Sequence, residues 1–139
     1  MQYQGVRWVT MFLVLLVVTS CATFARVNTS EVVEQRATER WAALIDGKLE
    51  SAYLFQTPEY RNIYSYKQYS KKIQGVGTWQ KAEVEKVDCV EKKCVVMVKV
   101  YVKIMFGRGL GVTESSGVIR EQWIESSTTK GEWYYVSGQ

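Results

Sequence analysis

Histidine is absent from this 139-residue sequence, and proline occurs once, at Pro58. The absence of histidine removes the commonest general base near neutral pH and the commonest metal ligand. The three cysteines form no Cys-x-x-Cys pair and the acidic residues do not cluster at metal-ligand spacing, so we expect no metal or other cofactor. Basic residues outnumber acidic ones by 18 to 14, but they form no run longer than a pair. A nucleic-acid-binding face would concentrate positive charge, so nucleic acid is not an expected partner.

A continuous apolar run near the amino terminus ends in a cysteine. Arg7 is the only charged residue before this cysteine, and the apolar run from Trp8 to Val18 leads into Thr19-Ser20-Cys21. Small residues before a cleavage point let a signal peptidase reach the backbone. The segment resembles a bacterial lipobox, which implies that residues 1–20 are a signal peptide and that the Cys21 thiol and the new amino terminus are acylated.

The alternative is a single transmembrane anchor. Residues 8–20 are shorter than the ~20 apolar residues that a membrane-spanning helix needs, although Ala22 to Ala25 would lengthen the run. Either arrangement places the domain outside the cytoplasm, and several acyl chains would hold it stably on a membrane. Residues 21–29 are then a lipidated tether, and residues 30–139 form one domain.

The residue after Cys21 bears on which membrane holds the protein. In Gram-negative lipoproteins an Asp at that position usually signals retention in the inner membrane, and here the residue is Ala22. We therefore expect an outer membrane lipoprotein facing the periplasm. Anchoring in the inner membrane, on its periplasmic face, is the alternative.

Three helices are predicted at the start of the domain. Ser30 is predicted to cap the first, which ends at Gly47. A second, short helix begins at Leu49, and Thr57 caps a third that restarts at Ser65 through a capping box. The expected buried faces are Val33, Ala37, Trp41, Leu44 and Ile45 in the first helix, and Tyr60, Ile63, Tyr64, Tyr69 and Ile73 in the third.

From Thr78 the pattern changes from helices to strands. Apolar residues of one parity from Val96 to Phe106 predict a long strand, whose apolar face should pack against the first helix through Trp41 and Leu44. The four predicted strands are residues 78–88, 94–106, 112–127 and 132–136. Helices followed by an antiparallel meander predict an α+β fold in which N-terminal helices pack on a curved four-stranded antiparallel sheet.

The order of these elements also resembles a known superfamily. The residues that carry the resemblance are Arg40-Trp41-Ala42-Ala43-Leu44 before Gly47, Ala52-Tyr53 before Thr57-Pro58-Glu59-Tyr60-Arg61, Glu121-Gln122-Trp123, and Gly131-Glu132-Trp133-Tyr134-Tyr135. Over residues 32–136 the chain resembles the nuclear transport factor 2-like (cystatin-like cone) superfamily, and its small uncharacterised bacterial lipoproteins in particular. The resemblance implies a cone-shaped α+β roll in which the helices lean over the concave sheet face.

Such a cone can leave a pocket lined by aromatic side chains with polar tips. The candidate pocket residues are Trp41, Tyr53, Tyr60, Tyr64, Trp79, Glu121 and Trp123. The alternative is that these aromatic residues simply fill the core. Glu121 shares a sheet face with Trp123 and can be a general base, a partner of Arg61 or Arg120, or a structural or solvated carboxylate, which is the favoured interpretation.

Cys89 and Cys94 flank the turn between the first two predicted strands. Facing residues of a hairpin lie ~4.5–5.5 Å apart at Cα, near the separation that a disulfide accepts. In an oxidising compartment we expect the two thiols to form a structural disulfide rather than a redox-active pair.

Two classes of function remain open. The first is a non-catalytic domain that binds a protein partner, a second copy of itself or a small apolar ligand in the cell envelope. The second, taken from the enzymes of the superfamily, is an isomerase, cyclase or dehydratase that uses a carboxylate and a tyrosine inside the cone. Those enzymes typically use an Asp or an Asp–His pair, and this chain has no histidine. Glu121 with Tyr53 or Tyr64 would have to serve, so we favour binding and predict no catalytic residue.

Overall fold

The computed structural model describes residues 28–105, 107 and 111–137, within which four helices precede a four-stranded antiparallel sheet. The helices are α2 (Thr29–Ile45), α3 (Leu49–Tyr53), α4 (Pro58–Ile63) and α5 (Tyr66–Lys72), and the strands are β1 (Trp79–Val90), β2 (Lys93–Met105), β3 (Val112–Glu125) and β4 (Trp133–Val136). The strands lie in the order β1-β2-β3-β4. The predicted α+β fold is confirmed.

The predicted signal peptide, residues 1–20, and Cys21 lie outside the described residues. At the end of the predicted tether, Asn28 caps α2 by accepting a hydrogen bond from the Ser30 backbone N–H at 3.2 Å. Ser30 is therefore inside the helix rather than its cap, because asparagine caps a helix at least as well as serine. Among the described residues, no helix is long and apolar enough to span a membrane.

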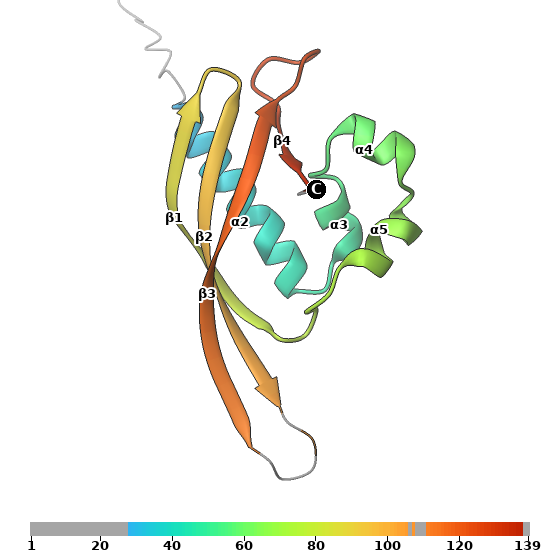
Figure 1. Cartoon of the computed structure of the whole chain (residues 1–139). Helices are drawn as coiled ribbons and strands as arrows, with labels where there is room; N and C mark the ends of the chain where they lie inside the picture. Colours follow the sequence, from blue (N-terminus) through green and yellow to red (C-terminus); the bar gives the residue numbers. More distant parts are fainter. Residues whose placement is uncertain (1–27, 106, 108–110, 138–139) are drawn as a thin grey trace, which may run out of the picture.

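Helix α2 lies across one face of the sheet, and α3, α4 and α5 gather beside β4 (Figure 1). Trp41 and Leu44 belong to the same buried core as Val96, Val98 and Val100, so the first half of the apolar face of β2 packs as predicted. Val102 still packs against this core, but the prediction is wrong at Ile104, which is 42% exposed because the β2–β3 hairpin extends beyond the helices. Phe106 lies outside the described residues.

The starts of α4 and α5 follow the predicted capping signals. The Thr57 side chain accepts a hydrogen bond from the Tyr60 backbone N–H at 3.1 Å. Ser65 and Gln68 form a reciprocal capping box at the start of α5. Ile63, predicted to be buried, is 69% exposed because it lies at the outer end of α4.

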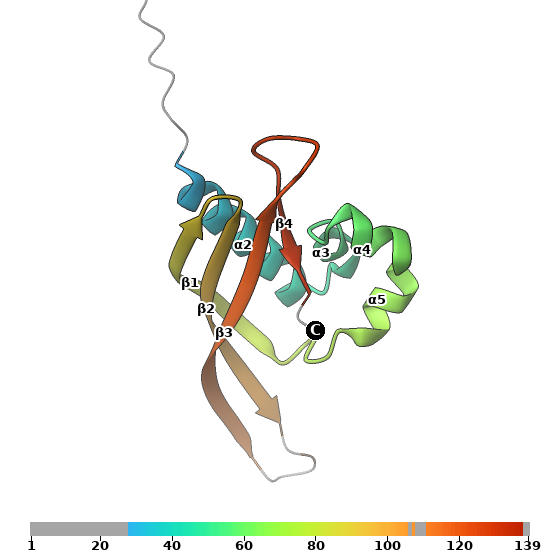
Figure 2. The ribbon, with the colours of Figure 1, turned by 45° about the horizontal axis from the view of Figure 1, so that its top comes forward.

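The sheet is open, with β1 and β4 as its two edges (Figure 2). Strand β4 pairs only with residues 122–125 of β3, whereas β2 pairs with β3 over its whole length. Residues 112–121 of β3 therefore have a strand partner on one side only within the described chain. The strands are curved and helices lie on one face of the sheet, as Figures 1 and 2 show. The predicted cone-shaped roll is not confirmed.

Candidate functional site

Glu121 is the centre of a buried polar network between α2 and β3. Its carboxylate accepts hydrogen bonds from Arg40 Nη1 at 2.7 Å, Trp41 Nε1 at 2.9 Å and Trp123 Nε1 at 3.1 Å. Glu121 is 2% exposed and Arg40 is 4% exposed. Arg40 on α2 supplies the opposite charge, and not Arg61 or Arg120, which the sequence offered as alternative partners. The burial of Glu121 agrees with a structural carboxylate, the favoured interpretation, and not with a solvated one.

Three more of the predicted pocket residues, all tryptophans, lie in the same part of the core. The Trp41 ring meets the Trp79 ring edge-on at 5.5 Å, and Trp123 is fully buried against Phe55 and Tyr135. Trp41, Trp79, Trp123 and Glu121 therefore belong to the core, and none of them lines the pocket described next.

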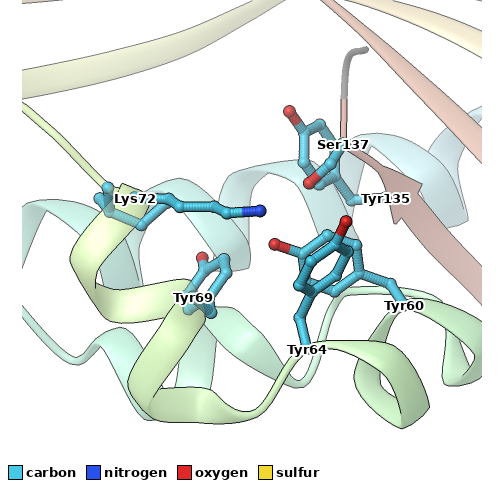
Figure 3. A pocket seen from close by; sticks show the side chains of 7 residues that line it. Tyr60, Tyr64, Tyr69, Lys72, Tyr135 and Ser137 are labelled. Atoms are coloured by element: carbon cyan, nitrogen blue, oxygen red, sulfur yellow. The ribbon is translucent and has the colours of Figure 1, made fainter.

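A pocket of about 420 Å³ lies between α4, α5 and the end of β4 (Figure 3). Tyr60 and Tyr64, both predicted, line one side of it. The other lining residues, which the sequence did not identify as a site, are Tyr69, Lys72, Ile73, Tyr135 and Ser137.

Helical spacing orients the tyrosines of α4 and α5. Tyr60 and Tyr64 are one turn apart, and their ring centroids are separated by 4.8 Å. Tyr69 approaches Tyr60 edge-on at 6.4 Å from the next helix. The predicted pocket residue Tyr53 supports this wall from behind, since its hydroxyl donates to the Tyr64 carbonyl at 2.6 Å and its ring packs on Tyr69.

The end of β4 closes the opposite side of the pocket. The Tyr135 backbone N–H donates to the Phe55 carbonyl at 2.8 Å, and Ser137 Oγ donates to Gln56 Oε1 at 3.0 Å. The Arg40 guanidinium lies 3.6 Å from the centroid of the Tyr135 ring. The buried Arg40–Glu121 pair therefore supports the pocket wall without entering the pocket.

The charges and hydrogen-bond donors of the pocket are unevenly satisfied. Lys72 Nζ lies 3.8 Å from the Tyr64 ring centroid, and it makes no ion pair within the part of the chain that the structure describes. Burial raises the pKa of the Tyr69 hydroxyl above its usual value, against smaller lowering effects of Arg40 and Gln56. Although Gln56 is near, neither the Tyr69 hydroxyl nor Gln56 Nε2 makes a hydrogen bond of good geometry to a described residue.

This arrangement is suited to non-covalent binding. Burial also raises the pKa of Tyr60, so the Tyr60 and Tyr69 hydroxyls stay protonated at neutral pH and can donate hydrogen bonds. The tyrosine rings add flat apolar walls, which is the usual composition of small-molecule pockets. No group of three metal-ligating side chains occurs among the described residues.

The two cysteines lie away from this pocket. Cys89 and Cys94 are cross-strand partners at the β1–β2 turn and are joined by a disulfide in the structure. Cys94 is buried in the core, while Cys89 packs at its margin. The disulfide closes the hairpin on the side that packs against α2.

No protein-family model matches the chain, and a search of curated proteins also gave no match. Two solved structures are similar. A SEC-C motif containing protein from Psychrobacter arcticus is 16% identical with a TM-score of 0.53, over 78% of this chain and 60% of that protein. A SEC-C motif containing protein from Rhodopseudomonas palustris is 18% identical with a TM-score of 0.49, over 72% of this chain and 71% of that one.

These comparisons correct the superfamily assignment. The Psychrobacter arcticus structure is that of a SEC-C motif containing protein, and none of the comparisons supports the nuclear transport factor 2-like superfamily. The predicted membership is therefore wrong. At 16% identity, the likeness to the Psychrobacter arcticus protein concerns the fold alone.

Proposed function

We propose that this chain is a membrane-anchored lipoprotein of the cell envelope whose domain binds a small, largely apolar ligand without catalysis. The observation that carries the proposal is the pocket of about 420 Å³ lined by Tyr60, Tyr64, Tyr69 and Tyr135. Its volume lies within the ~300–1,000 Å³ of typical ligand pockets. In this proposal the helices and the curved sheet form a cone-shaped roll, and the pocket lies at its open end.

An isomerase, cyclase or dehydratase is the less favoured alternative. Such an enzyme needs a carboxylate that can reach a bound substrate. Glu121 is the carboxylate on which such an enzyme was expected to rest, but it already accepts hydrogen bonds from Arg40, Trp41 and Trp123. It also does not line the pocket. Both facts favour binding over proton transfer.

The envelope location rests on the amino-terminal sequence. Acylation of Cys21 would attach the domain to a membrane, and Ala22 favours the outer membrane facing the periplasm. The segment between Cys21 and the start of α2 at Thr29 would leave α2 and the pocket in the aqueous compartment beside that membrane.

Binding of a neutral aromatic probe tests the proposal. Calorimetric titration of 2-naphthamide into the full-length chain in lipid nanodiscs, with empty nanodiscs as the blank, should show saturable binding. Loss of one stacking ring in Tyr64→Ala should weaken this binding up to about tenfold. Tyr101→Ala is the matched control, because the Tyr101 hydroxyl donates a hydrogen bond to Glu83 and Tyr101 does not line the pocket. Equal affinity in all three proteins would contradict the proposed site.

A protein partner is the second candidate, and the open edge of β3 favours it. Residues 112–121 of β3 lack a partner strand on their outer side in the described chain, and unpaired edges accept added strands. If two copies pair antiparallel about Gly117, Glu114 of one copy faces Arg120 of the other. Such opposed charges stabilise a cross-strand pair.

Sedimentation of the full-length chain in detergent tests this homodimer. The wild type and Arg120→Lys should sediment as dimers, whereas Arg120→Glu should shift toward monomer because it sets two glutamates against each other. A monomeric wild type, or a dimer that Arg120→Glu leaves unchanged, would refute pairing through this edge.

A further inference from the structure

We propose that the ligand of the tyrosine pocket is a small organic carboxylate, with a flat apolar body held by the tyrosine rings and its carboxylate held by Lys72. This inference rests on the proposed binding function and specifies the chemistry of its ligand. It follows from three features of the pocket, which are its charge, its unsatisfied hydroxyl and the occupation of its ring faces.

The charge of the pocket is positive. Lys72 is the only charged residue among the described residues that line it, and no acidic side chain lies among them. The Lys72 ammonium has no carboxylate within ion-pair distance in the described chain, and instead lies over the Tyr64 ring (Figure 3). A carboxylate that enters the pocket would give this ammonium its missing partner, and charge-assisted hydrogen bonds of this kind are stronger than neutral ones.

One lining residue has an unsatisfied hydroxyl. The Tyr69 hydroxyl is buried and makes no hydrogen bond of good geometry to a described residue, although the Gln56 side chain lies beside it. Buried polar groups in folded proteins are almost always paired, so a spare donor in the pocket calls for an acceptor. Tyr69 lines the pocket with Lys72, and both can donate to the oxygens of one carboxylate that lies between them.

The ring faces argue against a cationic ligand. Four tyrosines can form an aromatic cage for an ammonium group, but the Lys72 ammonium already lies 3.8 Å from the centroid of the Tyr64 ring. A cationic ligand would meet the repulsion of Lys72, which no described lining residue neutralises.

The experiment compares three probes of one shape and different charge. 2-Naphthoate, the neutral 2-naphthamide and 2-naphthylmethylammonium are titrated into the full-length chain in nanodiscs, in the wild type, Lys72→Met and Lys71→Met. Lys71 precedes Lys72 on α5 and does not line the pocket, so it controls for the general charge of the helix.

We expect 2-naphthoate to bind the wild type and Lys71→Met about five- to tenfold more tightly than 2-naphthamide. Lys72→Met should remove this preference, so that it binds 2-naphthoate no more tightly than 2-naphthamide. Equal binding of the acid and the amide in the wild type would overturn the carboxylate assignment while leaving the proposed binding function intact. Preferred binding of the ammonium probe would overturn it in favour of an aromatic cage. Absence of binding by all three probes would overturn both.

Discussion

Removal of the Glu121 carboxylate should destabilise the domain far more than removal of an exposed carboxylate on the same strand. In Glu121→Leu, the Arg40 guanidinium stays in a site where it is 4% exposed but has lost the carboxylate that pairs with it at 2.7 Å. Loss of one member of a buried pair costs ~3–5 kcal/mol. The indole N–H groups of Trp41 and Trp123 also lose their acceptor, so the free energy of unfolding should fall by at least the lower end of that range.

Glu114→Leu is the matched control. Glu114 is also on β3 and also forms an ion pair. Its partner is Lys103 at 3.5 Å, and the Glu114 side chain is 75% exposed. Exposed pairs contribute ~0–1 kcal/mol, so this variant should unfold at nearly the denaturant concentration of the wild type.

The assay is urea unfolding of the full-length chain in mild detergent, followed by far-ultraviolet circular dichroism and tryptophan fluorescence. The double variant Arg40→Leu/Glu121→Leu removes the orphaned charge and should be more stable than Glu121→Leu alone by about 1–3 kcal/mol. If Glu121→Leu and Glu114→Leu unfold alike, or if the double variant gains nothing, the buried pair does not hold α2 to β3 as argued.

The other predictions concern the core, the disulfide, the anchor and alkaline stability. Trp41→Ala should lower the free energy of unfolding by ~3–5 kcal/mol because it truncates a large ring that is 4% exposed, and a variant as stable as the wild type would refute the packing of α2 on the sheet. Mass spectrometry of unreduced peptides should show Cys89 linked to Cys94, and replacing both with Ser should cost less than ~3 kcal/mol because the closed loop is short. Cys21→Ser should abolish labelling by a radioactive fatty acid, and sucrose-gradient recovery of the wild type with the inner membrane would contradict the outer-membrane assignment. Because burial raises the pKa of the Tyr69 hydroxyl, the folded state should lose stability as the pH rises above ~10, and Tyr69→Phe should reduce this loss in an alkaline denaturation series.

Local signals in the sequence predicted the elements well. The Thr57-Pro58 start of α4 and the Ser65–Gln68 capping box of α5 both appear in the structure, because each depends only on neighbouring residues. The alternation along β2 likewise predicted a strand of almost the observed length.

Which side chains are buried depends on contacts between elements that are distant in the sequence, and the alternation of apolar residues along one strand does not encode those contacts. The face of β2 is apolar through Ile104, yet none of the described helices covers the end of the hairpin, so Ile104 is 42% exposed. Glu121 was recognised as sharing a face with Trp123, but its partner on α2 could not be chosen among the arginines of the chain. That choice depends on how α2 crosses the sheet.

The candidate pocket could be predicted only in part. Tyr60 and Tyr64 are one helical turn apart, and both were among the predicted pocket residues. Tyr135 and Ser137 reach the same pocket from the far end of the chain, through the contact of β4 with residues 55 and 56. Trp41 and Trp79, which the resemblance to a cone-shaped fold assigned to the pocket, instead pack against each other in the core.

The central claim is that the four tyrosines form a ligand site, and fluorine NMR of the full-length chain labelled with 3-fluorotyrosine tests it most directly. Single Tyr→Phe variants would assign the resonances of Tyr60, Tyr64, Tyr69 and Tyr135, with Tyr101 as the reference away from the pocket. Addition of 2-naphthoate should shift the four pocket resonances together with one dissociation constant and leave the Tyr101 resonance in place. A titration in which the pocket resonances do not move, or move no more than that of Tyr101, would contradict the account.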